Sequence, residues 1–342
     1  MPTATNFFSM TPTFKPRLPA PSPSPTPEAF QPEPEPTNLI VRLRHGLGTH
    51  LTLAQVQPYL EANRRNAGSL LAAFWATCDR SLLQEARERY PNDPRVNLVA
   101  YFSTPLDSRQ QTSPEHRELL ERFKRSDPEN ALGHYLAARD YFKADQTDKA
   151  VEELTAAAGK GRFEDYSTHF TQDSEEAWRA AGYSEAEAKF IASASLGISS
   201  LVEVKRLGED LVALANAYQQ AGDAASAQAV LRMGVTLGNQ LDQPSTPVLL
   251  RNLAGLRVQS QVLSALAPST PYDDGGRTVA ERLAEIEQRR KALLSLNEQG
   301  IKARETASDA DLVSFFDREK ALGSESALRW LLSRQSMPKA QE

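Results

Sequence analysis

Two distant stretches of this chain repeat one pattern of small, aromatic and large side chains. The intervals between the five positions are three, nine, four and three residues in both stretches. The first set is Ala138, Tyr141, Ala150, Leu154 and Ala157, and the second is Ala215, Tyr218, Ala227, Leu231 and Gly234. A repeat of this kind predicts helix pairs that bury their apolar faces by stacking on one another.

The pattern has a simple mechanical interpretation. A small residue on the first helix lets the second helix approach, a tyrosine fills the space between them, and the second helix carries a small and then a large residue. Gly222 is expected to end the first helix of the later copy, where a left-handed backbone favours glycine. Asp145 takes that place in the earlier copy, so we expect more backbone strain there.

Helical spacing and helix-start signals continue along most of the chain, and segments with the alternation typical of strands are nearly absent. The fold class predicted is therefore all-α. The clearest expected N-terminal caps are Ser113 before Pro114, Thr278 with Glu281, and Ser308 with Asp311. Pro105 is expected to cut one helix short.

Composition and periodicity divide the chain into five parts. Half of the 22 prolines fall in the first 36 residues, where they remove backbone donors and favour an extended, semi-rigid spacer. The predicted parts are a disordered Pro-rich linker at 1–38, a connecting segment and first helix at 39–62, a repeat domain at 63–241, a C-terminal helical cap at 242–336 and a disordered tail at 337–342. A degenerate helix pair with an insertion is expected between Asp165 and Leu207.

The C-terminal part is predicted to close the open end of the stack. Four apolar residues form one helical stripe, and a second group is expected to make a terminal core: Val279, Leu283, Ile286 and Leu293, then Phe315, Phe316, Trp330 and Leu331. A helix packed on the last pair is favoured over a coiled-coil dimer, because Arg290 interrupts the stripe. The chain is accordingly expected to be a monomer or a weak dimer.

The repeated residues resemble the tetratricopeptide repeat, a helical hairpin whose copies stack into a right-handed solenoid. The resemblance covers residues 131–164 and 208–241 well and residues 63–130 in part. It implies a concave groove, lined by the first helix of each hairpin, in which an extended peptide or a partner's helix binds.

By the family's pattern, nine positions would be exposed in that groove: Leu132, Tyr135, Arg139, Phe142, Lys143, Glu209, Val212, Asn216 and Gln219. The earlier five are aromatic, aliphatic and basic, which suits an acidic or C-terminal peptide with an apolar anchor. Packing against the neighbouring hairpin is the alternative for Tyr135 and Phe142. The family's best-known groove grips a terminal carboxylate with Lys and Asn residues; Asn216 alone matches in kind and place, so chaperone-tail binding is not expected.

Charge and cysteine content exclude several other classes of function. The net charge is −5, from 44 acids and 39 bases without a sustained run of either sign, which argues against nucleic-acid binding. Cys78 is the single cysteine, so no internal disulfide or thiolate zinc site is expected, and its apolar neighbours predict burial. His45, His50 and His169 lack a preorganised set of ligands nearby, so we expect neither a metal nor another cofactor.

Neither a membrane-spanning run nor a signal peptide is expected. No window reaches 18 apolar residues, and the opening MPTATNFFSM lacks the basic and apolar regions of a signal peptide. The chain as written is therefore predicted to be cytoplasmic, without membrane contact. A Pro-rich lead also follows anchors and signals, so export or membrane tethering through an upstream segment stays open.

These features predict a non-catalytic scaffold for protein–protein interaction, with a protein or peptide as partner. Two alternatives remain at this point. One is the same scaffold tethered at a membrane through an upstream segment, and the other is a helical enzyme with a site between helices, because fold alone does not exclude catalysis.

Overall fold

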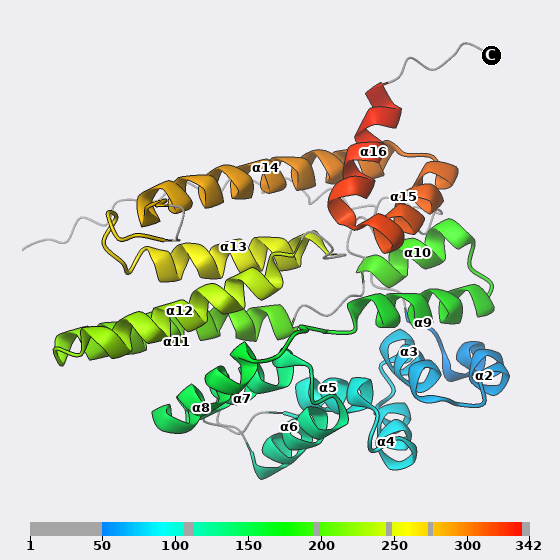
Figure 1. Cartoon of the computed structure of the whole chain (residues 1–342). Helices are drawn as coiled ribbons and strands as arrows, with labels where there is room; N and C mark the ends of the chain where they lie inside the picture. The colour runs from blue at the N-terminus through cyan, green and yellow to red at the C-terminus, as the bar shows by residue number, and fades with distance from the viewer. Residues whose placement is uncertain (1–49, 106–112, 195–198, 244–247, 273–275, 337–342) are drawn as a thin grey trace, which may run out of the picture.

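A computed structural model describes residues 50–105, 113–194, 199–243, 248–272 and 276–336 (Figure 1). Within these ranges the chain is all-α, and β-type pairing is limited to isolated bridges between Asn130 and Arg162 and between Pro271 and Thr278. The predicted Pro-rich linker at 1–38, most of the connecting segment and the predicted tail at 337–342 lie outside the described residues.

The described helices follow one another closely along the chain. They are α2 (Leu53–Ala62), α3 (Ala67–Thr77), α4 (Arg80–Arg89), α5 (Pro94–Ser103), α6 (Pro114–Ser126), α7 (Ala131–Lys143), α8 (Thr147–Ala158), α9 (Ser167–Ala180), α10 (Glu185–Ala194), α11 (Ser199–Gln220), α12 (Ala224–Leu241), α13 (Leu249–Leu263), α14 (Val279–Thr306), α15 (Asp309–Leu322) and α16 (Ser324–Ser336). Consecutive helices pack on each other, as in the pairs α3–α4, α5–α6, α7–α8, α9–α10, α11–α12 and α15–α16.

The helix starts confirm the predicted caps. The Ser113 side chain accepts a hydrogen bond from the backbone of His116, and Ser308 accepts one from Asp311, so each satisfies an otherwise unpaired amide of its helix. Thr278 and Glu281 form a reciprocal capping box at the start of α14. Helix α5 ends at Ser103, just before Pro105, as expected.

The repeated residues occupy equivalent places in two helix pairs. The small residues Ala138, Ala150, Ala215 and Ala227 are buried, and Tyr141 and Tyr218 pack partly buried against the main core. Both pairs turn through three residues, with a positive φ at the middle one: Asp145 has φ 54° and Gly222 has φ 82°. The predicted strain at Asp145 is therefore confirmed, since an aspartate holds a backbone conformation that favours glycine.

The order of helix packing differs from the order of the chain. Helix α7 packs on α11 and α8 on α12, whereas the intervening pair α9–α10 packs on α2 and α3 through α9 and on α15 through α10. Figure 1 shows α9 and α10 between the N-terminal helices and the C-terminal ones. The pair expected between Asp165 and Leu207 therefore exists, but it lies to one side of the pairs that carry the repeat.

The C-terminal helices bury the predicted stripe and terminal core. Val279, Ile286 and Leu293 of α14 are buried where this helix packs on α13 and α16. Phe315, Phe316 and Leu331 are buried in the same cluster, and Trp330 packs against it. None of the helices in the described ranges combines the length and the apolarity that crossing a membrane requires.

Candidate functional site

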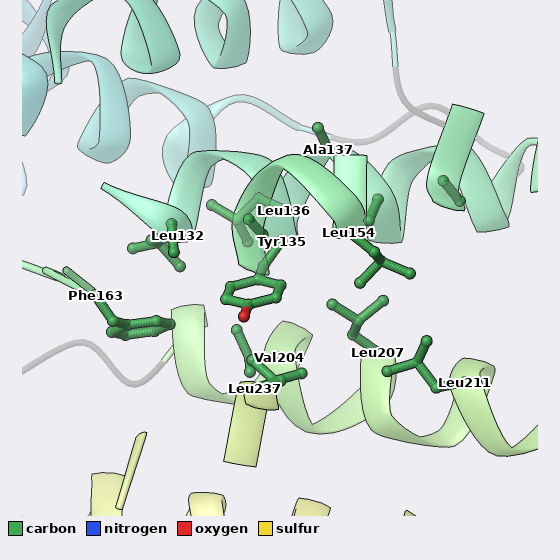
Figure 2. Packing of buried hydrophobic residues seen from close by; sticks show 14 of the residues in the cluster. Leu132, Tyr135, Leu136, Ala137, Leu154, Phe163, Val204, Leu207, Leu211 and Leu237 are labelled. Atoms are coloured by element: carbon green, nitrogen blue, oxygen red, sulfur yellow. The ribbon is translucent and has the colours of Figure 1, made fainter. Parts of the chain in front are cut away.

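The predicted groove face of α7 is covered by other helices. Leu132 and Tyr135 are 0% and 2% exposed, so the prediction that they line an open groove is wrong. Helices α11 and α12 lie over this face, and Figure 2 shows the Tyr135 ring pointing toward Val204 and Leu237. The Tyr135 hydroxyl donates a hydrogen bond of 2.8 Å to Oε1 of Gln240 on α12, and burial raises its pKa.

The two cationic residues of the predicted groove pair with acids of α11. Nζ of Lys143 lies 2.9 Å from Glu203, and the Arg139 guanidinium lies 3.1 Å from Asp210. Burial acts to raise the pKa of Glu203, but the hydrogen bond from Lys143 and the neighbouring cations hold it below its ordinary value. Burial raises the pKa of Asp210 despite Arg139. A free basic surface on α7 is therefore also a wrong prediction, because α11 neutralises it within the fold.

The remaining predicted groove residues do not extend this surface. Phe142 and Val212 pack partly buried against the main core. Glu209 lies 3.6 Å from Lys205 at the surface of α11, and Asn216 and Gln219 are exposed further along the same helix. The structure thus leaves the later residues accessible but does not join them to Tyr135 in one exposed groove.

An open groove does exist elsewhere, and first helices of several pairs line it. Two adjoining hollows share Phe102 of α5 and Ser199 of α11 in their walls. We call them together the Trp75 groove, after Trp75 of α3, which is 40% exposed. The main apolar side chains in its walls are Trp75, Leu98, Phe102, Phe170 and Val202.

The two hollows differ in chemistry. The hollow beside Trp75 has a volume of about 60 Å³, and among its described lining residues Asp165 carries the single charge. The hollow beside Val202 has a volume of about 280 Å³ and is bounded by Lys143, Glu203, Tyr101 and His116. The groove therefore offers an apolar and aromatic floor with Asp165 in the hollow beside Trp75 and Lys143 and Glu203 in the hollow beside Val202, which suits an apolar anchor of a partner segment.

The polar end of the groove is organised by hydrogen bonds among buried groups. The Tyr101 hydroxyl donates a hydrogen bond of 3.1 Å to Oδ2 of Asp140, and burial together with Asp140 raises the pKa of Tyr101. The His116 ring packs edge-on against Tyr101, with 5.4 Å between the ring centroids. These contacts fix the wall of the groove where α5, α6 and α7 meet.

A third hollow, of about 410 Å³, lies where α9, α10 and α11 meet the C-terminal helices. Its wall includes Glu319, whose carboxylate accepts a hydrogen bond of 2.7 Å from Ser324, and burial raises the pKa of Glu319. Lys320 in the same wall forms an ion pair with Glu175 of α9. Among the described residues, no three His, Cys, Asp or Glu side chains stand close enough together to hold a metal ion.

Lys143 is the predicted groove residue that lies in the wall of the Trp75 groove, whereas the apolar residues Trp75, Phe102 and Val202 were not predicted from the sequence. Val202 carried a usable signal, because it falls off the apolar stripe that Leu201, Val204 and Leu211 form on α11. Trp75 carried none, since almost every face of α3 is apolar and periodicity cannot identify its exposed side.

Cys78 is a further correction. It is exposed, because it caps the C-terminus of α3 in a left-handed conformation with φ 59° instead of continuing the buried helix. Its Sγ lies 3.5 Å from Nδ1 of His50.

Comparisons with known proteins identified no relative of this chain. No protein-family model matches the chain, and no curated protein or solved structure matches it either. The class that the structure itself defines is an all-α protein of packed helix pairs with a groove beside Trp75.

Proposed function

We propose that this protein is a tetratricopeptide-like scaffold that binds a segment of a partner protein in the Trp75 groove. The repeat supports the tetratricopeptide likeness, because residues with the same intervals occupy equivalent places in α7–α8 and α11–α12. The position of the groove supports the function, because most of its lining residues belong to first helices of pairs, namely α3, α5, α7, α9 and α11. Two lining residues come from second helices: His116 of α6 and Ala192 of α10.

The exposure of Trp75 is the observation that carries the proposal. Trp75 and Val202 are 40% and 38% exposed, although both are large apolar side chains next to a buried core. Leaving such side chains in water is unfavourable, and clusters of them mark interaction sites. Tryptophan is also among the residues that most often dominate binding energy at interfaces.

The partner chemistry follows from the walls of the groove. Phe102 and Phe170 are partly buried beside Trp75, so an aliphatic or aromatic side chain of the partner would find contacts on several sides. The basic residues of α7 cannot select an acidic tail, because Glu203 and Asp210 already neutralise them. We therefore propose an apolar anchor in place of the acidic or C-terminal peptide.

Site-specific photocrosslinking tests the proposal in the organism that makes the protein. A photoreactive amino acid replaces Val202 in the groove or, as a matched control, Leu294, an exposed apolar residue of α14 that is 43% exposed. We expect a discrete crosslinked partner from position 202 and not from position 294. Equal crosslinking from both positions, or none from position 202, contradicts the proposal.

A further inference from the structure

The chain enters its folded body at the edge of the Trp75 groove. The backbone amide of Leu51 donates a hydrogen bond of 2.8 Å to the carbonyl of Ala76, the residue next to Trp75. His50 lies beside Cys78, two residues further along. Residues that precede His50 are therefore tethered next to the groove, whatever path they take.

A short apolar run lies a few residues before this entry point. Leu39, Ile40, Val41 and Leu43 are followed by a segment that contains Gly46 and Gly48. The residues from Arg44 to His50 span at most about 25 Å when fully extended, at about 3.3 to 3.6 Å per residue. An apolar run of this length is too short to form a stable helix or hairpin by itself, so an apolar surface within that reach would be a favourable place for its side chains.

The groove matches this run in chemistry as well as in position. Its walls near Trp75 are aromatic and aliphatic, and Asp165 is the charged residue among the described lining of that hollow. The run itself combines aliphatic residues with Arg42 and Arg44. An apolar floor with an acidic group is complementary to an aliphatic segment with basic groups.

We propose that residues 39–43 dock in the Trp75 groove of their own chain and compete with an external partner. The inference rests on the proposed function, because it assigns the same groove an internal occupant. A short tether gives such an occupant an effective concentration in the millimolar range. An external segment therefore binds only when its binding is favourable enough to displace residues 39–43 from the groove. The groove is in this sense self-inhibited.

Fluorine NMR of the full-length chain tests the docking. All tryptophans are labelled with 5-fluorotryptophan, and the Trp75 signal is assigned with Trp75→Phe. The test variant carries Leu39→Ser, Ile40→Ser and Leu43→Ser. The matched control carries Phe7→Ser, Phe8→Ser and Phe14→Ser, which remove equally apolar side chains from a more distant part of the lead.

We expect the test variant to shift the Trp75 signal toward that of a solvent-exposed ring and the control variant to leave it unchanged. A synthetic peptide of residues 37–47, added to the test variant, should restore the original signal. The signal of the unmodified chain should not change on tenfold dilution, because the contact lies within one molecule. A single Ile40→Ser substitution should give a smaller shift in the same direction.

Three results overturn the docking: an unchanged Trp75 signal in the test variant, a shift in the control variant, or a signal in the unmodified chain that depends on concentration. The last would indicate docking between two copies. Failure of the proposed function can be distinguished from failure of the docking. If the docking is right and the proposed function is wrong, the Trp75 signal shifts in the test variant, but no partner crosslinks at position 202 even when the apolar run is removed.

Discussion

Lys143 on α7 and Glu203 on α11 form an ion pair of 2.9 Å across two helices that are far apart in the chain. Their side chains are 16% and 15% exposed, so the pair is shielded from most of the solvent. This ion pair joins α7 and α11, the first helices of the two pairs that carry the repeat. It also neutralises the charge of Lys143, which was expected to form part of a basic surface on α7. Charge reversal at this position therefore tests the packing of α7 on α11, and its readout is the stability of the fold.

Lys143→Glu should destabilise the protein by about 2 to 4 kcal/mol, because it leaves Glu203 facing a like charge in a partly buried place. Chemical denaturation measures the free energy of unfolding. Lys205→Glu is the matched control, since Lys205 also lies on α11 but is 50% exposed and pairs with Glu209 of the same helix. The control should lose less than about 1 kcal/mol; equal losses in both variants contradict the burial of the Lys143 pair.

The equivalent turn positions Asp145 and Gly222 make a second prediction. Gly222 has φ 82°, which an alanine rarely adopts, so Gly222→Ala should cost about 1 kcal/mol or more. Asp145→Gly should leave the free energy of unfolding unchanged or raise it by up to about 1 kcal/mol, because relief of strain offsets the entropy of glycine. A loss of stability in Asp145→Gly would show that the two turns are not equivalent.

The repeat-bearing pairs were predictable because their signals are local. Ala138, Tyr141 and Gly222 report on contacts within one helix pair and on its turn, and those depend on residues close in sequence. The packing of α7 on α11 differs from these contacts, because it joins helices that are far apart in the sequence. Glu203 and Asp210 of α11 pair with Lys143 and Arg139 of α7. This pairing can be predicted only if α7 is known to pack on α11 rather than on α9, and no local sequence pattern gives that information.

The candidate site was missed for the same reason. Trp75, Phe102 and Val202 come from three helix pairs, and their exposure depends on where those pairs sit relative to one another. On their own helices, Trp75 and Phe102 resemble ordinary core residues, and only Val202 lies off the apolar stripe of its helix. Burial in a helical protein is decided by tertiary packing more than by hydrophobic pattern alone.

The contact between α12 and α13 gives a third prediction. A Cβ atom added at Gly255 would lie 2.6 Å from the backbone oxygen of Gly238, so the two helices would have to move apart. Gly255→Ala should cost roughly 1 to 3 kcal/mol by overpacking. Gly161→Ala is the control, because a Cβ there would meet nothing within 4 Å. Thermal unfolding that is unchanged in Gly255→Ala would contradict the close approach of the helices.

The turn between α2 and α3 provides a prediction on pH. Arg65, which has φ 49°, holds Glu85 of α4 with hydrogen bonds of 2.8 and 2.5 Å. Those bonds, with Arg89, lower the pKa of Glu85 from 4.5 to about 2. Because the folded pKa lies below the unfolded one, the stability from this group is complete above about pH 4.5 and is lost as the pH falls toward 2.

Glu85→Gln should therefore cost about 1 to 2 kcal/mol at pH 7, a value reduced for partial exposure to solvent. The difference from the unmodified protein should shrink at pH 3, as measured by chemical denaturation at both pH values. Glu88→Gln is the control, since Glu88 is exposed and accepts a hydrogen bond of 2.7 Å from Gln84 on the same helix. A difference that stays constant between pH 7 and pH 3 would show that the Arg65 pair does not form.

The most direct test of the account is the effect of Trp75 on peptide affinity. Peptides selected from a displayed library against the full-length chain with Leu39→Ser, Ile40→Ser and Leu43→Ser are measured by titration on that chain with and without Trp75→Ala. We predict a loss of affinity of about 10- to 100-fold, as expected for an aromatic side chain at the centre of an interface. Leu294→Ser should leave the affinity unchanged. Equal affinities with and without Trp75→Ala would contradict the Trp75 groove as the binding site.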